Sequence, residues 1–271
     1  MRTLRKSLLI AGLIFIVFVN LHAQRRFSIA AGTGTAYYYG DLTDNFTNSF
    51  FRPALQISGS AYLLPVFSLR LGVSYGLVGA SDAQASSETR RLRNLHFRSP
   101  VGEVSLTGVY EFIPDRNFGV SWRNQLHFSP YIFGGIAVFG FDPRAEYEGE
   151  WVRLRPLGTE GQYIGDNGKR PYSFAQAAIP FGGGVSLRVS DFIGISLEAG
   201  YRITFTDYLD DVSTMYPEPD ALIASGGALA AALSNRTGGP LPANSIRGNP
   251  GVKDSYVFTT FSVVYYLERN R

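Results

Sequence analysis

The sequence predicts an all-β protein, a transmembrane antiparallel β-barrel of about eight strands that follows a cleaved signal peptide. Three observations predict this fold. The chain begins with a basic and apolar leader, its later apolar residues alternate with polar ones, and it is rich in Gly (30), Tyr (16) and Phe (20). No segment after the leader carries a long apolar stripe with the period of a helix.

The first 23 residues have the layout of a secretory signal peptide. Arg2, Arg5 and Lys6 precede an apolar run at residues 8–19, and Ala23 is the small residue at the expected cleavage site. A membrane-spanning helix would need roughly 20 apolar residues, more than this run provides. We therefore expect residues 1–23 to be removed and residues 24–271 to form one exported domain.

Removal of the leader also changes the charge balance. The chain has 25 Lys+Arg and 22 Asp+Glu, and the leader carries three of the bases and no acid, so the exported domain is close to neutral. A nucleic-acid partner, which would need a lasting basic face, is not expected. The absence of cysteine excludes disulfides, thiolate metal sites and a lipid-modified cysteine.

Alternation of apolar and polar residues defines the strands. It is clearest at residues 67–77, where every second residue from Phe67 to Leu77 is apolar. Each such segment is about long enough to cross a bilayer when tilted. The eight predicted strands are residues 27–38, 53–63, 67–77, 102–112, 131–141, 180–189, 192–204 and 256–267.

The connections between these strands alternate between short and long. Leu64-Pro65 and Ser190-Asp191 are tight turns, whereas residues 39–52, 79–98, 142–178 and 205–254 are long loops. Outer-membrane barrels combine short periplasmic turns with long external loops in this way. One connection on the short-turn side, residues 114–129, is too long for a tight turn, and we treat it as a candidate docking surface.

A soluble sandwich or lipocalin-like barrel is the alternative, because alternation alone does not say which face points inward. Two features favour the membrane. Tyr and Phe gather at strand ends, where an interfacial aromatic girdle would lie, as in Tyr37 to Tyr39 and Tyr265-Tyr266. The polar face is also too charged for a packed soluble core. The expected location is therefore the outer membrane of a Gram-negative cell, with membrane lipid as a partner.

Six charged residues share the polar face of the predicted strands. An eight-stranded barrel is filled by side chains, so charges that face inward must pair and hydrogen-bond. We expect an ionic plug, which would make the barrel a scaffold and not a pore; the alternative is that some of the six lie in water at strand ends. These residues are Arg70, Glu103, Glu111, Arg188, Glu198 and Arg202.

Candidate chemical sites are weak. His127 and Ser129 lie two residues apart on one strand face, as in the His-x-Ser of lipid A deacylases, but at the expected periplasmic end. Asp207, Asp210 and Asp211 could bind calcium, yet they lack the spacing of an EF-hand loop, so a solvated or arginine-paired loop is favoured. We expect no enzyme activity, no cofactor and no metal. The glycines at 182–184 lie within a strand and mark close packing in the barrel wall.

Several blocks of sequence resemble a known family. They are Tyr39-Gly40-Asp41-Leu42, Ser129-Pro130-Tyr131 with Phe133-Gly134-Gly135, Leu157-Gly158-Thr159-Glu160-Gly161-Gln162, Ile179 to Gly184, and Tyr201-Arg202 followed by Thr204 to Ser213, which includes Asp207, Tyr208, Asp210 and Asp211. In order and spacing they resemble the PorG-like family of Bacteroidota outer-membrane proteins.

The resemblance implies an outer-membrane β-barrel and, as in the best-known member, a component of the type IX protein secretion system. The implied partner is the periplasmic ring built by the lipoprotein PorK and its partner PorN. The alternative function is a stand-alone surface barrel that binds an external ligand or supports membrane integrity; a lipid-modifying enzyme is a more distant third.

The long loops carry their own expectation. Arg202 at a strand end, with Glu160 and the acids Asp207, Asp210 and Asp211, would form charge-assisted bonds that fold these loops over one mouth of the barrel. Residues 221–249 are rich in Ala, Gly, Ser and Pro, so we expect a mobile loop with one short helical turn near residues 228–233.

Overall fold

The computed structural model describes residues 26–43, 51–114, 126–165 and 169–267. The predicted signal peptide lies outside the described residues, and so does most of the candidate docking segment 114–129. Among the residues that are described, no helix has the length and apolar character needed to span a membrane.

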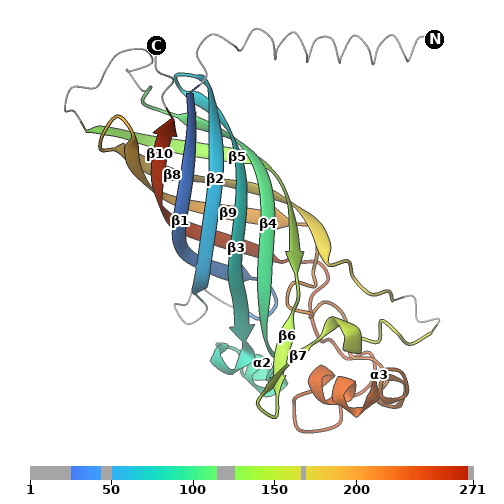
Figure 1. The fold of residues 1–271 in the computed structure, drawn as a ribbon. Helices are drawn as coiled ribbons and strands as arrows, with labels where there is room; N and C mark the ends of the chain where they lie inside the picture. Colours follow the sequence, from blue (N-terminus) through green and yellow to red (C-terminus); the bar gives the residue numbers. More distant parts are fainter. Residues whose placement is uncertain (1–25, 44–50, 115–125, 166–168, 268–271) are drawn as a thin grey trace, which may run out of the picture.

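Eight long strands form a closed antiparallel β-barrel, which confirms the predicted fold (Figure 1). Around the ring they follow chain order, and pairing of β1 with β10 closes it. The eight are β1 (Arg26–Tyr39), β2 (Arg52–Leu64), β3 (Phe67–Ser81), β4 (His96–Glu111), β5 (His127–Phe141), β8 (Ala175–Arg188), β9 (Ile193–Thr204) and β10 (Ser255–Leu267).

The barrel carries its apolar side chains outside and its polar ones inside. On β3, Leu71 and Val73 are 57% and 55% exposed, whereas the neighbouring Ser68 and Ser74 are buried. The outer faces of the other strands are likewise apolar, because successive side chains of a strand point to opposite faces. On β5 both faces are apolar, with Tyr131, Phe133 and Phe139 inside. This arrangement is the reverse of a soluble lipocalin-like barrel, whose apolar face points inward.

Glycines in β8 and β9 leave room for aromatic side chains inside the barrel. A Cβ atom on Gly184 would lie 2.6 Å from the ring of Tyr131, and one on Gly200 would lie 2.7 Å from the ring of Phe133. Tyr131 is in β5, which pairs with β8 in a register that places it opposite Gly184. The glycine run at 182–184 therefore lies in the barrel wall, as its position within a strand predicted.

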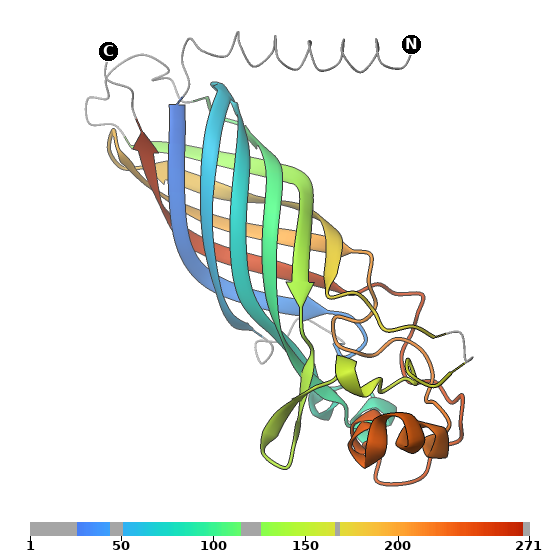
Figure 2. The same cartoon turned by 45° about the vertical axis from the view of Figure 1, so that its right-hand side comes forward.

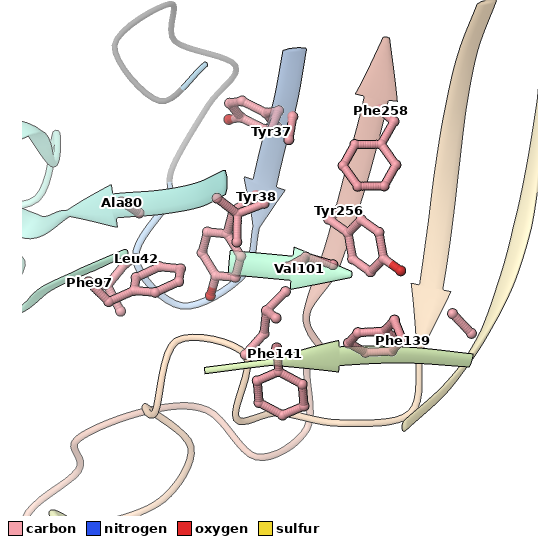
Figure 3. Packing of buried hydrophobic residues seen from close by; sticks show 14 of the residues in the cluster. Tyr37, Tyr38, Leu42, Ala80, Phe97, Val101, Phe139, Phe141, Tyr256 and Phe258 are labelled. Carbon is pink, nitrogen blue, oxygen red and sulfur yellow. The ribbon is translucent and has the colours of Figure 1, made fainter. Parts of the chain in front are cut away.

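The two ends of the barrel differ (Figure 2). One end has the β2–β3 and β8–β9 turns, and the described chain begins and finishes there, since Phe27 pairs with Leu267. The other end carries the long connections. There the interior is packed with aromatic side chains: Figure 3 shows Tyr38 of β1, Phe139 of β5 and Tyr256 of β10 in one cluster of buried residues. The Phe139 and Tyr256 ring centroids are 5.2 Å apart.

The long connections contain more regular structure than the sequence predicted. The loop after β5 includes a hairpin of β6 (Arg144–Tyr147) and β7 (Glu150–Arg153), followed by the 3-10 helix η3 (Arg155–Leu157). The loop after β3 holds η2 (Asp82–Gln84) and α2 (Glu88–Arg93). In place of one helical turn near residues 228–233, the structure has α3 (Pro219–Ser234), kinked at Gly227, so that expectation was too short.

Candidate functional site

Arg70 and Glu198 form an ion pair across the barrel interior. Arg70 Nη1 on β3 lies 2.5 Å from Glu198 Oε2 on β9, and the two strands are on opposite walls of the ring. The Tyr131 hydroxyl donates to the same carboxylate at 2.9 Å, and the Arg70 guanidinium lies 4.8 Å from the centroid of the Phe133 ring. This pair therefore ties opposite walls together through a filled interior.

Arg202 and Glu103 form a second, more deeply buried pair. Arg202 Nε and Nη2 donate to the two carboxylate oxygens of Glu103 at 3.0 and 3.2 Å, and the Tyr256 hydroxyl donates to Glu103 at 2.8 Å. Both residues are 2% exposed. Arg202 therefore points into the barrel, and the expectation that it would bind the acids of the long loops was wrong.

The other two charged residues of the predicted plug lie at the short-turn end. Arg188 donates from Nε to the Ser190 carbonyl at 3.1 Å and also to the Asp191 carbonyl, so it holds the β8–β9 turn. Its guanidinium lies 4.2 Å from the ring centroid of Tyr266. Glu111 is half-buried at the end of β4. Four of the six residues therefore form two central ion pairs, and Arg188 lies at a turn.

Glu160 is the centre of a compact cap that the long loops form over the aromatic end of the barrel. Its side chain is fully buried and accepts hydrogen bonds from the backbone N–H groups of Ser213 (2.8 Å) and Thr214 (3.0 Å), and from the Thr214 hydroxyl (2.7 Å). Burial alone would raise the pKa of Glu160, but Arg247 and these hydrogen bonds outweigh it and lower the pKa. Glu160 is therefore a buried carboxylate.

Arg247 supplies the positive charge of the cap. It is 2% exposed, and its Nη1 lies 3.0 Å from Glu160 Oε1 and donates to the Asp211 carbonyl. Its Nε donates to the Ser234 carbonyl at the end of α3 (3.3 Å). One guanidinium thus joins the loop before β8, the loop after β9 and the helix α3. Sequence reasoning missed Arg247 because it lies in a segment that composition marked as a mobile loop.

The remaining residues of the loop blocks contribute to the same cap. Gly158 and Gly161 have positive φ angles of 60° and 81°, which a glycine adopts without strain. Thr159 and Tyr172 donate to the Asp211 carboxylate, the latter at 2.8 Å. Burial raises the pKa of Asp211 to about 6, against the opposing effects of Arg247, Thr159 and Tyr172. The Tyr208 ring stacks on the Tyr172 ring with centroids 4.8 Å apart.

Two aspartates of the cap share one tyrosine. The Tyr38 hydroxyl lies 2.6 Å from Asp210 Oδ2 and 2.8 Å from Asp254 Oδ1, and all three side chains are buried. Burial raises the pKa values of both aspartates well above the usual range. Repulsion from Asp254 adds to this for Asp210, and repulsion from Asp207 and Asp41 adds to it for Asp254. Asp207 accepts from the Ser213 hydroxyl at 2.7 Å, and burial raises its pKa to about 7.

The first loop block, residues 39–42, joins the cap from the β1 end. Leu42 is buried, whereas Tyr39 is exposed on the barrel surface. The Asp41 carboxylate accepts from the Asn249 N–H at 2.8 Å, and its carbonyl accepts from Arg93 at 3.1 Å. A Cβ on Gly40 would collide with the Asp254 carboxylate and the Tyr38 ring, which explains the glycine at this position.

Arg93 ends the short helix α2 and fastens it to the cap. Its Nε and Nη2 lie 2.7 and 2.8 Å from the two carboxylate oxygens of Asp82, and its Nη1 donates to the Arg247 carbonyl at 2.5 Å. Asp82, itself fully buried, also accepts from the Leu95 N–H at 3.0 Å. Neither residue belongs to a recognised block, so sequence reasoning missed this pair as well.

The geometry offers little support for catalysis or metal binding. The Ser129 side chain is fully buried, and its hydroxyl donates to the Ile113 carbonyl at 3.1 Å, so it is held away from any external substrate. Within the described part of the chain, no group of three or more His, Cys, Asp or Glu is arranged to hold a metal ion. Asp211 is an arginine-contacting residue of the cap rather than the start of an open calcium loop.

Solved structures with a similar fold are outer-membrane barrels of low sequence identity. The N-terminal β-barrel domain of Pseudomonas aeruginosa OprF is 11% identical (TM-score 0.37), and the match covers 90% of this chain and 98% of that one. Neisserial surface protein A is 8% identical (TM-score 0.44; 88% and 96% covered). Ail of Yersinia pestis, in complex with the heparin analogue sucrose octasulfate, is 9% identical (TM-score 0.43; 90% and 99% covered).

Comparison at the level of sequence families gives one result. None of the curated proteins matches the chain. Residues 6–224, which include seven of the eight barrel strands and most of the cap, match the model of a domain of unknown function, DUF6089. The chain therefore belongs to the DUF6089 family.

Proposed function

We propose that this protein is a non-enzymatic β-barrel of the Gram-negative outer membrane that serves as an anchor or scaffold. The observation that carries the proposal is the inside-out distribution of side chains. Large apolar residues are exposed all around the barrel, and contiguous apolar surface of this extent is unusual on soluble monomers. Examples from six strands are Ile57, Leu71, Leu106, Ile136, Leu197 and Val263.

The height of this apolar surface fits a bilayer. On the outer face of β4 it extends from Tyr110 past Leu106 and Val104 to Pro100, and the first three of these are 44%, 47% and 53% exposed. Ten residues of strand span roughly 33 Å, or about 25 Å along the membrane normal at a tilt of about 40°. Outer-membrane barrels have an apolar band about 25 Å tall.

The filled interior supports a scaffold over a pore. Two ion pairs cross the lumen, aromatic side chains fill the end under the cap, and the cap covers that end. The distribution of loops supports an orientation with the short turns in the periplasm and the cap outside the cell, as in other outer-membrane barrels.

We further propose that the barrel is PorG-like and acts in type IX secretion by contacting a periplasmic ring lipoprotein of the PorK/PorN kind. Support comes from the loop blocks of the resemblance. Those at residues 39–42, 157–162 and 204–213 are far apart in the chain but contribute hydrogen bonds to one cap. The stand-alone surface barrel remains the second candidate, since the cap faces outward.

A pulldown from native outer membranes tests the secretion role. The barrel, tagged after Arg271, is extracted in mild detergent, and its partners are identified by mass spectrometry. Recovery of ring lipoproteins in fixed proportion supports the role. Recovery of the folded, heat-modifiable barrel alone contradicts it and favours the stand-alone function.

Two segment replacements locate the contact. A tight turn in place of residues 115–125 removes the candidate periplasmic surface, and we expect it to abolish recovery of the ring proteins. A Gly/Ser chain of equal length in place of residues 237–243, in an external loop, is the matched control and should leave recovery unchanged. Equal recovery from both variants would exclude the 114–129 segment as the contact.

A further inference from the structure

The rim of the barrel beside β4 and β5 carries a group of arginines on its outer face. We name this group the arginine rim; it comprises four arginines and two aromatic residues from β4, β6, β7, η3 and the residue that precedes β8. The hairpin β6–β7 that bears two of them continues the sheet beyond the end of β4 (Figure 1). The members of the arginine rim are Arg98, Arg144, Arg153, Arg155, Trp151 and Phe174.

Strand register places these side chains on the face that the apolar band also occupies. Leu106 and Val104 are exposed on the outer face of β4, and Arg98 is an even number of residues away, so it points the same way. Arg98 pairs with Arg144 on β6, and Arg144 pairs with Arg153 on β7. Three arginines therefore stand side by side on the outer surface of one sheet.

Their height is that of the lipid headgroups. The apolar band on β4 ends near Pro100, and Arg98 lies two residues further, or about 5 Å higher along the membrane normal. If the barrel has the orientation proposed above, this level is the headgroup layer of the outer leaflet. The inference thus rests on the proposed location of the barrel.

Aromatic rings hold two of the guanidinium groups in place. The Arg98 guanidinium lies 3.7 Å from the centroid of the Trp151 ring, and that of Arg155 lies 3.9 Å from the centroid of the Phe174 ring. Stacking of this kind orients a guanidinium while leaving its edge N–H groups available for a planar or tetrahedral anion. Arg155 Nε donates a hydrogen bond to the Tyr172 carbonyl at 2.7 Å.

The local charge is strongly positive. Asp142 lies beside the arginine rim and pairs with Arg144 at 2.8 Å and with Arg153 at 2.8 Å. Among the described residues, no carboxylate forms an ion pair with Arg98 or Arg155. Of the acids of the hairpin, Glu148 and Glu150 lie at its tip and Glu146 lies opposite Trp151, two residues beyond Arg144; all three are further from the apolar band than Arg144 and Arg153. Positive charge thus faces the membrane and negative charge faces away from it.

We propose that the arginine rim binds the phosphate groups of outer-leaflet lipid, as a phosphorylated glycolipid of the lipid A type presents them. The guanidinium edges match phosphate oxygens, Trp151 and Phe174 lie where aromatic residues meet the membrane interface, and the acyl chains would lie against the apolar band of β4 and β5.

Trp151 provides a reporter for this site. The chain has two tryptophans, and the other is Trp122, so Trp122→Phe leaves Trp151 as the single fluorophore. The full-length barrel in this background is placed in nanodiscs of neutral phospholipid that contain either a diphosphorylated lipid A-type glycolipid or the same glycolipid without phosphates. Trp151 emission and the number of glycolipid molecules retained, counted by native mass spectrometry, are measured in parallel.

We expect the phosphorylated glycolipid to bind at least about tenfold more tightly than its dephosphorylated form, the factor that one charge-assisted hydrogen bond commonly provides. Arg98→Gln with Arg153→Gln should abolish this preference, and Arg98→Lys should retain part of it. Lys253→Gln, which removes a charge before β10 on the opposite wall, should leave the preference intact.

Three results would overturn the inference. They are equal retention of the two glycolipids, an unchanged preference in the double glutamine variant, and the same emission change with inorganic phosphate at equal concentration, which would assign the site to a free anion. A barrel that fails to enter nanodiscs, or that lacks heat-modifiable mobility in lipid, would instead contradict the outer-membrane location itself, so the two failures are distinguishable.

Discussion

At the scale of single residues, Tyr38 and its two aspartates must hold an additional proton. The phenol has one hydrogen and can donate it to one carboxylate at a time, yet its oxygen lies within 2.8 Å of both Asp210 and Asp254. A second hydrogen is needed between the three oxygens, so one of the aspartates is protonated. This agrees with the raised pKa values of both.

This shared proton predicts a cap that weakens as the pH rises. The pKa values of Asp210 and Asp254 are raised in the folded cap, so above about pH 4 the folded state binds more protons than the unfolded state. The contribution of these groups to the stability of the cap is therefore complete below about pH 4 and is lost as the pH rises. Asp211, with a pKa of about 6, and Asp207, with a pKa of about 7, change the stability of the cap in the same direction. Cleavage of residues 205–216 by a nonspecific protease should accelerate at least about tenfold from pH 5 to pH 9.

Two variants separate this effect from the pH dependence of the protease. Asp210→Asn, which has nearly the same shape and no charge, should flatten the dependence, because only one carboxyl then remains beside Tyr38. Asp220→Asn removes an exposed acid at the start of α3 and should behave as the wild type. If the cleavage rates of the wild type and of Asp210→Asn changed with pH to the same extent, no shared proton would stabilise the cap.

A second prediction at this scale concerns the buried pair in the lumen. Arg202→Met leaves Glu103 charged and without its arginine inside the barrel, and we expect it to lower the free energy of unfolding by about 3–5 kcal/mol. The double variant Arg202→Met/Glu103→Gln removes both charges and should recover much of this loss. Urea unfolding of the barrel in detergent measures both.

Arg153→Gln is the control for the loss of an arginine. Arg153 is half exposed in its pair with Asp142, so its loss should cost under about 1 kcal/mol. If Arg202→Met proved equally mild, the pair in the lumen would not be a significant part of the barrel's stability.

At the scale of elements, the hairpin β6–β7 depends on the conformation of its turn. Glu148 and Gly149 both have positive φ angles, 51° and 86°, as a type I′ turn requires. Glu148→Asn should therefore stabilise the hairpin, and Gly149→Val should loosen it, because a β-branched residue is strained at positive φ. In the Trp122→Phe background, Trp151 emission should shift to longer wavelength in Gly149→Val but not in Glu148→Asn. If both variants gave the same spectrum, the stability of the hairpin would not depend on the conformation of its turn.

Period-two alternation predicted the eight strands well, because the lipid-facing and lumen-facing sides differ most where the barrel crosses the apolar band. It failed at the start of β5, which begins at His127 and not at residue 131 and so takes residues 127–129 from the predicted connection 114–129. It also failed at the ends near the cap. There β3 extends to Ser81 and β4 begins at His96, because the strands continue beyond the membrane and residues such as Val78 and Phe97 pack into the aromatic cluster. The length of helix α3 was underestimated because its Ala, Gly and Ser content resembles that of a loop. Glu218 followed by Pro219 is nevertheless a helix-start signal. In the structure the Glu218 carboxylate accepts a hydrogen bond from the Ala221 N–H at 2.7 Å.

The cap shows the limit of sequence reasoning on a larger scale. The loop blocks around Glu160 and Asp210 were recognisable from their residues, but their arginine was not. Charge and spacing suggested Arg202, which lies closest in the chain, whereas the folded protein uses Arg247, which comes from another loop. Which buried charges pair depends on how distant segments of the chain pack together, and the residues around each charge do not reveal this.

At the scale of the whole molecule, barrel and cap are held by different interactions, and this predicts that they can be separated. The barrel wall rests on inter-strand hydrogen bonds, whereas the cap is held by buried polar contacts centred on the ion pair of Glu160 with Arg247. Arg247→Met leaves Glu160 without its charge partner, so we expect the loops at 157–162, 205–216 and 245–254 to become protease-sensitive. The barrel should remain folded and heat-modifiable on gels.

Arg170→Gln, which removes an exposed arginine from the same side of the molecule, should leave the cap resistant. If Arg247→Met unfolded the barrel as well, the two parts would form one cooperative unit, and the cap would be a condition for the fold. If only the cap opened, the external surface could vary or rearrange without loss of the membrane anchor. That outcome would agree with a scaffold whose membrane part is constant and whose exposed part carries the specific contacts.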